Sequence, residues 1–408
     1  MTETMNTKYP SPVYIHGCGF NSALGIDVHT IHHRLGLGCS PDMHLVSNRL
    51  NNGGETVIGE VTSSLPSMPE RLKQYDTRNN RLAMSALAQI EENVTRAVAK
   101  YGADRVAVVV GTSTSGIADG ELALSEQLKS GEFPNHYHYQ VQEVGNLGEF
   151  IADYFGLEGP AYTVSTACSS SGRVFLSARR LLKAGLADAV IVGGADSICQ
   201  LTLNGFNGLE ALSSSLCNPF SANRNGINIG EAAAFMLLSL AAEDSEEQGP
   251  RIALLGAGDS SDAHHISAPH PEGKGAVEAM QKALADAGMT ADDIGYINAH
   301  GTATPLNDAM ESKAICQVFA DRVPVSSTKP MTGHTLGAAS AVEAAICWHI
   351  LRYGLLLPVQ TNDGEVDPEL APIQLVAEGT VLAKNAILSN SFAFGGNNIS
   401  LIFGYAND

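Results

Sequence analysis

Cys168 is the residue whose surroundings best suit nucleophilic chemistry. It lies in the segment 164–172 (VSTACSSSG), between a strand-like stretch and the start of a helical pattern. Small neighbours leave room for a substrate beside the sulfur. A helix N-terminus favours the thiolate, so we expect a lowered pKa for this thiol. For this segment alone, a buried structural cysteine is an equally good interpretation.

His300 is the second candidate, in the segment 297–308 (INAHGTATPLND). It follows a short apolar stretch that reads as a strand, and a histidine at a strand end can exchange protons near neutral pH. Thr302 and Thr304 offer hydroxyl groups to a polar ligand. For this segment alone, a histidine that only hydrogen-bonds to the backbone of a turn is the simpler interpretation.

Two further segments complete the set. Lys329 and His334 lie in the segment 326–343 (SSTKPMTGHTLGAASAVE), where the lysine could orient a histidine and Glu343 could support it. The segment 389–398 (SNSFAFGGNN) has a glycine pair whose amides could face an anion. One cysteine and two histidines in separate loops match the general arrangement for nucleophilic catalysis.

The elements that must position these residues alternate along the chain. Short β-branched stretches alternate with helical patterns, which predicts a layered α/β fold with a largely buried sheet. The expected strands cover residues 105–110, 187–192, 232–240, 252–255, 294–298, 323–326, 374–376, 386–390 and 399–403, and the expected helices cover 80–100, 169–184, 275–287, 308–319 and 338–353.

Composition narrows the function classes. The chain has 408 residues and a net charge of −19, which disfavours a general nucleic-acid binder. Its seven cysteines form no CxxC pair, so neither a zinc site nor a disulfide framework is expected. No stretch reaches the roughly 20 apolar residues of a membrane helix. We therefore expect a cytoplasmic protein with no membrane or nucleic-acid partner and no bound metal.

The four segments, taken in order, resemble those of the β-ketoacyl-acyl-carrier-protein synthases, and most closely the elongating type with a Cys-His-His triad. The family belongs to the thiolase-like superfamily. The resemblance implies a thiolase fold, in which two similar α/β halves, each with a five-stranded sheet, stack as α-β-α-β-α. We expect these halves at residues 1–250 and 251–408, with a charged break at 244–250 between them.

The resemblance also implies roles for individual residues. Cys168 would carry the acyl group, and its backbone N–H with that of Phe394 would form the oxyanion hole. His300 and His334 would assist decarboxylation of a malonyl unit, supported by Lys329. The expected supporting acids are Asp308, Glu311 and Glu343, and the residues expected along the phosphopantetheine arm or acyl path are Thr302, Thr304, Phe206 and Phe394.

The implied partner is an acyl carrier protein, which would supply the phosphopantetheine arm, so no other cofactor is expected. Because carrier proteins are acidic, the expected docking patch is a basic cluster of Arg71, Lys73, Arg78 and Arg81. Charged side chains that are simply exposed to solvent at the start of a helix explain this cluster equally well. The resemblance also implies a dimer, either a homodimer or a heterodimer with a related chain-length-factor subunit. The opening segment VYIHGCGFNSALG is similar to ketosynthases of aryl polyene clusters, which often pair with a related chain-length factor.

Three other functions fit parts of the same pattern. A degradative thiolase would carry a second cysteine in its C-terminal glycine-rich segment, and residues 389–398 contain none. A non-catalytic chain-length factor would have lost the nucleophile, whereas Cys168 is present. An initiating synthase would carry asparagine in place of His334. An elongating synthase therefore fits the sequence best. Ala393 and Asn397 depart from the usual pattern, which leaves the substrate open.

Overall fold

The computed structural model describes residues 12–242 and 249–406, and its strands form two half-sheets with the same strand order. The order of the first is β5-β4-β6-β8-β1, and that of the second is β11-β10-β13-β14-β9, extended by β12 at its edge. The first contains β1 (Val13–Ser22), β4 (Val106–Gly111), β5 (Ala161–Val164), β6 (Ala189–Asp196) and β8 (Ala232–Ser239). The second contains β9 (Ile252–Ser261), β10 (Tyr296–Asn298), β11 (Pro324–Ser326), β12 (Gln374–Leu375), β13 (Ala386–Phe392) and β14 (Asn397–Tyr405).

Strand directions repeat between the two half-sheets. In the first, β4 is parallel to β5 and β6, while β8 is antiparallel to both β6 and β1. In the second, β10 is parallel to β11 and β13, while β14 is antiparallel to both β13 and β9. A short antiparallel pairing of Val13–Ile15 with residues 252–254 joins the half-sheets along one edge.

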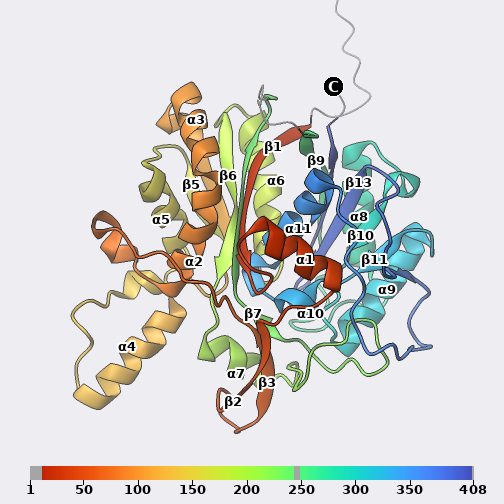
Figure 1. Ribbon diagram of the computed structural model, residues 1–408, viewed down its shortest axis with the longest axis horizontal. Helices are drawn as coiled ribbons and strands as arrows, with labels where there is room; N and C mark the ends of the chain where they lie inside the picture. Colours follow the sequence, from red (N-terminus) through yellow and green to blue (C-terminus); the bar gives the residue numbers. More distant parts are fainter. Residues whose placement is uncertain (1–11, 243–248, 407–408) are drawn as a thin grey trace, which may run out of the picture.

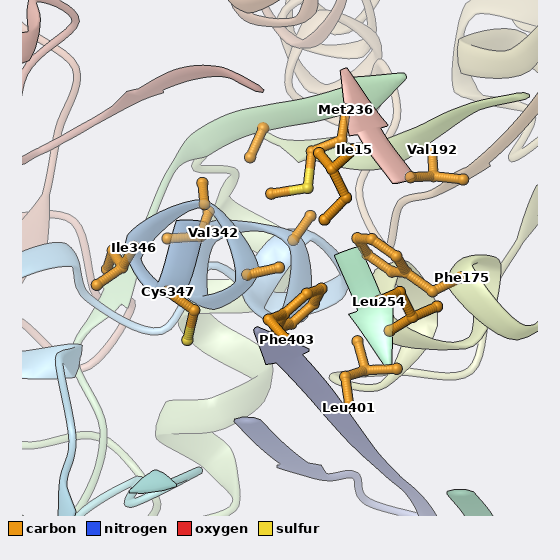
Figure 2. Packing of buried hydrophobic residues seen from close by; sticks show 14 of the residues in the cluster. Ile15, Phe175, Val192, Met236, Leu254, Val342, Ile346, Cys347, Leu401 and Phe403 are labelled. Carbon is orange, nitrogen blue, oxygen red and sulfur yellow. The ribbon is translucent and has the colours of Figure 1, made fainter. Parts of the chain in front are cut away.

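Two helices lie between the half-sheets, α6 (Ser170–Lys183) and α11 (Ala339–Tyr353). Their apolar side chains pack against strands of both halves in one core. Figure 2 shows Phe175 of α6 and Val342 of α11 in this core, beside Ile15, Met236, Leu254 and Phe403 from four strands. Most residues of α11 are buried, as expected for a helix enclosed on nearly every side, whereas α6 also carries basic side chains that form ion pairs.

Other helices cover the outer faces of the two halves (Figure 1). On the first half these are α2 (Arg78–Leu87), α3 (Glu91–Tyr101) and α5 (Asn146–Phe155), and on the second they are α8 (Lys274–Ala287) and α9 (Pro305–Phe319). The five-layer α-β-α-β-α arrangement is confirmed. Further elements are α1 (Val28–Leu37), α4 (Ile117–Ser130), α7 (Gln200–Gly208), α10 (Lys329–Thr332) and a small sheet of β2 (Met43–Ser47), β3 (Glu55–Gly59) and β7 (Ile229–Gly230).

The expected helix over residues 80–100 is wrong in one respect, because a 3₁₀ turn at Ala88–Ile90 separates α2 from α3. At this turn the Gln89 amide donates to the Phe20 carbonyl oxygen of β1 and accepts from the Phe20 N–H. Gly19 of β1 lies so close that a Cβ there would collide with the Ala86 carbonyl. A 3₁₀ turn that hydrogen-bonds to β1 therefore stands where a continuous helix was expected.

The proposed division into residues 1–250 and 251–408 stays a prediction. Of the charged break at 244–250, only residues 249–250 are among those the structure describes. No helix of the described chain is both long enough and apolar enough to cross a membrane.

Candidate active site

Cys168 lies in the turn between β5 and α6 and is almost completely buried. The preceding residue, Ala167, has φ 52°, a conformation that costs an L-residue roughly 1 kcal/mol. The Ser170 hydroxyl stabilises the turn, since it donates to the Ala167 carbonyl at 2.6 Å and accepts from the Thr166 N–H at 2.8 Å. The serines that follow Cys168 therefore hold the strained turn that presents the sulfur.

His334 is the histidine that touches the sulfur. Its Nε2 lies 3.1 Å from Cys168 Sγ, and its Nδ1 accepts a hydrogen bond from the Leu336 N–H at 3.2 Å. Because Nδ1 is an acceptor, the neutral imidazole carries its proton on Nε2. The backbone of His334 is fixed on both sides by pairing with residues 228 and 230.

His300 stands at the end of β10 with its ring 5.3 Å from that of His334 and almost perpendicular to it. Lys329 Nζ lies 3.4 Å from His300 Nδ1 and 2.5 Å from the His300 carbonyl oxygen. An ammonium group can only donate, so Nδ1 is the acceptor and Nε2 of His300 carries the proton. Both histidines therefore present N–H donors from their Nε2 atoms.

Three buried carboxylates support this pair. Glu343 accepts from Lys329 Nζ at 2.5 Å, and both groups are almost fully buried. Glu311 accepts from the backbone N–H groups of His300 and Gly301 at 2.8 and 2.7 Å. Asp308 accepts from the N–H groups of Ala303 and Phe220. The acids therefore hold the lysine and the His300 turn instead of facing the sulfur.

The expected low pKa of the Cys168 thiol is wrong for the free protein. Burial raises this pKa to about 11, against the opposing effects of the Lys329 charge and the backbone N–H groups of Phe394 and Cys168. The helix α6 begins only at Ser170, and because Cys168 is buried, the loss of solvation outweighs the effect of the helix start. The two N–H groups expected in the oxyanion hole both lower the pKa of the thiol, and their role in catalysis stays a prediction.

Both histidines have a pKa well below the usual value. Burial is the main cause for each, followed by the positive charge of Lys329, and for His300 also by His334. They are therefore neutral near pH 7 and act as hydrogen-bond donors without carrying charge. Burial also raises the pKa of Glu311 to about 7.

A cavity of about 240 Å³ opens over these groups. Its lining includes Cys168, His300, His334, Thr302 and Thr304. The two threonine hydroxyl oxygens lie 2.9 Å apart. The rings of Phe206 and Phe394, 5.8 Å apart, also line it. The structure thus brings the predicted nucleophile, both histidines and the predicted arm-binding residues to one cavity.

Comparison with known families identifies the fold and the chemistry. Residues 57–243 match the model "Beta-ketoacyl synthase, N-terminal domain", and residues 252–362 match "Beta-ketoacyl synthase, C-terminal domain". The chain belongs to the β-ketoacyl synthase family. The predicted thiolase fold and the predicted condensing acyltransferase are thereby confirmed.

Individual relatives of this synthase agree. It is 31% identical to the chloroplastic 3-oxoacyl-[acyl-carrier-protein] synthase II of Arabidopsis thaliana, over 98% of this chain and 77% of that one. It is 33% identical to 3-oxoacyl-[acyl-carrier-protein] synthase 2 of Staphylococcus aureus, over 81% of this chain and 85% of that one.

Among solved structures, the ketosynthase ApeO in complex with its chain length factor ApeC from Xenorhabdus doucetiae is 47% identical. The match covers 97% of this chain and 98% of that chain, with a TM-score of 0.92. The ishigamide ketosynthase/chain length factor is 27% identical over 97% and 100% of the two chains, with a TM-score of 0.83. The elongating synthase is thus favoured over the thiolase and chain-length-factor alternatives.

The basic cluster expected to dock a carrier protein is partly neutralised within the synthase, because two carboxylates pair with three of its four cations. Arg78 pairs with the buried Glu231, while Lys73 and Arg81 both pair with Asp76. Arg71 donates to the carbonyl oxygens of residues 153 and 154. The docking role of these residues stays a prediction.

Sequence reasoning missed several residues around the site. Ser340 of α11 donates to the Cys168 carbonyl oxygen at 3.2 Å, and its hydroxyl also lies 2.7 Å from that of Ser391. Ser391 in turn donates to Glu343 at 3.2 Å. These serines lie inside two of the four motif segments, but a serine among small residues carries no signal of its own. The expected absence of a metal stays a prediction, although Cys168, His300 and His334 place three ligand atoms within 4.8 Å.

Proposed function

We propose that Cys168 is the acyl-carrying nucleophile of an elongating synthase that condenses an acyl group with malonyl-acyl carrier protein. The observation that carries this proposal is the 3.1 Å contact between Cys168 Sγ and His334 Nε2, with His300 beside it in the same cavity. Covalent storage of the acyl group divides one difficult condensation into two easier steps.

In the first step the sulfur attacks the thioester carbonyl of an acyl carrier protein. The new bond joins Sγ to the acyl carbon, and the carrier leaves as a thiol that takes up the proton lost by Cys168. The tetrahedral oxyanion would accept from the N–H groups of Cys168 and Phe394, both of which lower the pKa of the Cys168 thiol. Thr302 and Thr304 would contact the phosphopantetheine arm in the cavity.

In the second step the malonyl unit loses its carboxylate as CO₂, and the bonding electrons form an enolate. The Nε2–H groups of His300 and His334 would donate to the enolate oxygen, which neutral imidazoles can do without prior protonation. The enolate carbon attacks the acyl carbon, the Cys168 thiolate leaves, and a β-ketoacyl carrier protein results.

Replacing Cys168 by Ala tests this assignment. Cys168→Ala should abolish the acyl adduct seen by intact-mass analysis with acyl-acyl carrier protein, because no nucleophile remains. The far-UV circular dichroism should not change, since the thiol forms few of the contacts of the core. Cys217→Ala is the matched control, because Cys217 is buried at 1% exposure and does not line the cavity. An acyl adduct that persists in Cys168→Ala would disprove the assignment.

We further propose that the partner subunit is a chain-length factor and that the product is a polyene made in the cytoplasm. The 47% identity to a ketosynthase held by its chain length factor supports this, as does the similarity of the opening segment to aryl polyene ketosynthases. The edge strand β5 and the exposed Leu122 and Leu128 of α4 offer a surface for such a partner on the first half.

Co-expression tests the partner. The synthase should co-purify with a chain-length factor as a one-to-one dimer, measured by light scattering. Leu128→Lys, which places a charge on a side chain that is 78% exposed, should weaken that dimer without unfolding the chain. An unchanged dimer in Leu128→Lys would remove α4 from the interface.

A further inference from the structure

Asp196, the last residue of β6, is a fully buried carboxylate that takes no part in the chemistry described above. It accepts five hydrogen bonds, and no lysine or arginine of the described ranges forms an ion pair with it. A buried carboxylate held only by neutral donors is costly to desolvate, and this cost calls for an explanation.

The two oxygens of Asp196 bind two different segments. Oδ1 accepts from the Thr112 and Thr114 hydroxyls and from the Ser113 and Thr114 N–H groups, all at 2.7–2.8 Å. These residues form the loop that follows β4. Oδ2 accepts from the Ala338 N–H at 2.8 Å. Ala338 ends the 3₁₀ turn Leu336–Ala338, which connects His334 to α11.

This turn controls the ring of His334. The Leu336 N–H donates to His334 Nδ1, and Leu336 has φ 50°, a conformation that requires support from its surroundings. At Gly337 a Cβ would lie 2.7 Å from the Ser113 hydroxyl and 2.8 Å from its backbone nitrogen. The turn is therefore pressed against the same loop that Asp196 holds.

We propose that Asp196 is a positioning residue that clamps the Leu336–Ala338 turn and so keeps His334 Nε2 directed at Cys168. The proposal rests on the proposed function only in that it takes this contact to be the catalytic one. Asp196 acts through His334 and touches no reacting atom. If the clamp is released, the Nε2–H to sulfur hydrogen bond weakens, and the thiolate loses a stabilising donor.

The variant Asp196→Asn isolates the clamp. The amide of the Asp196→Asn side chain has one acceptor oxygen, and this oxygen will accept from the four donors of the loop that follows β4. Its NH₂ then faces the Ala338 N–H, so two donors oppose each other and the turn is released. Gly337→Ala should displace the same turn by an independent route, because its methyl group collides with Ser113 while Asp196 is unchanged.

The matched control is Asp286→Asn. Asp286 also accepts a backbone N–H, from Ala257 at 2.9 Å, and pairs with Arg179, but it does not line the catalytic cavity. Asp286→Asn makes the same chemical change at another carboxylate that supports the fold, and so it reports any general loss of stability.

The readout is the pH dependence of Cys168 alkylation by iodoacetamide, which follows the thiolate and needs no synthase activity. In Asp196→Asn and Gly337→Ala the profile should move to higher pH. Alkylation at a fixed pH below the thiol pKa should slow about tenfold for each pH unit by which the profile moves. Malonyl-carrier decarboxylation should fall by about tenfold to a hundredfold, as expected for a displaced catalytic group. Asp286→Asn should match the wild type in both.

The outcomes separate cleanly. An unshifted alkylation profile in Gly337→Ala overturns the proposal, as does the same profile in a folded Asp196→Asn. If Asp196→Asn does not fold, Gly337→Ala decides alone. A wild-type protein that fails to decarboxylate malonyl-acyl carrier protein refutes the proposed function instead, and leaves the alkylation comparison valid.

Discussion

At the scale of single residues, the site works by placing neutral donors around a sulfur that is costly to ionise. Burial raises the pKa of Cys168 to about 11, and the Lys329 charge and two backbone N–H groups oppose this rise. Burial lowers the pKa of both histidines, and the charge of the same lysine lowers it further, so that both stay neutral at pH 6.5. One buried ammonium thus favours the thiolate and disfavours imidazolium.

Lys329→Met tests this double effect. Without the ammonium, the pKa of the Cys168 thiol should rise further, and the pKa of His300 and His334 should rise toward the usual value. Cys168 alkylation near pH 7 should slow about tenfold for each pH unit by which the thiol pKa rises. The acid limb of malonyl decarboxylation should move to higher pH, because the histidines gain protons sooner.

Lys282→Met is the control for this prediction, because Lys282 is half exposed and pairs with Glu278 on α8. It should leave both profiles where the wild type has them. Identical alkylation profiles for Lys329→Met and wild type would contradict the electrostatic coupling.

At the scale of elements, the nucleophile depends on how closely α6 and α11 approach each other. The Ser340 hydroxyl of α11 donates to the Cys168 carbonyl, and the Ser171 hydroxyl of α6 accepts from the Ala341 N–H. Gly172 permits the approach, because a Cβ there would lie 2.9 Å from Ser340 Oγ and 2.7 Å from Ile399 Cγ2. The helix start that carries Cys168 is thus locked to the helix that follows His334.

Gly172→Ala should therefore destabilise the protein by about 1–3 kcal/mol through overpacking. The displaced helix start should also slow acyl loading, measured by intact mass. Urea unfolding gives the stability, and Gly36→Ala is the matched control. Gly36 lies in α1, and a Cβ added there would meet no atom within 4 Å, so its replacement should stabilise by about 0.4–1 kcal/mol. A Gly172→Ala protein as stable as wild type would show that the helices can separate freely.

At the scale of the whole molecule, a net charge of −19 leaves few basic groups to attract an acidic carrier protein. Within the predicted docking cluster, Lys73 has the most exposed of the ion-paired side chains, at 60%. Arg78 differs in kind, because its partner Glu231 is buried and also accepts from the Val61 N–H. The cluster therefore combines a surface charge with a structural ion pair.

Lys73→Ala should raise KM for the carrier protein a few-fold with kcat unchanged, and should reduce the salt dependence of kcat/KM, as a rim charge does. Arg78→Ala should instead lower stability by about 3–5 kcal/mol, because Glu231 is left buried without its cation. Steady-state kinetics at two salt concentrations measure the loss of docking expected for Lys73→Ala. Urea unfolding measures the loss of stability expected for Arg78→Ala. Lys282→Ala, at a lysine of the second half that is 51% exposed, should change neither KM nor stability. An unaltered KM in Lys73→Ala would exclude this residue from docking.

The sequence by itself determined the reactive residue types and the local elements. Cys168, His300, Lys329 and His334 each stand where a strand or helix begins or ends, and these boundaries follow from hydrophobic periodicity and from small residues within a few positions. The strands β4, β6, β8, β10 and β13 lie close to where the sequence places them. The family resemblance then supplied the order of the layers.

Only the tertiary structure decided properties that depend on distant partners. The raised pKa of Cys168 results from burial by both halves, which outweighs the helix start that the sequence shows. The separation of α2 from α3 results from pairing with β1, some 70 positions earlier. Glu231 and Asp76 partly neutralise the basic cluster, and Asp196 joins segments more than 140 positions apart. Desolvation and long-range hydrogen bonds depend on the folded surroundings, so no local pattern reveals them.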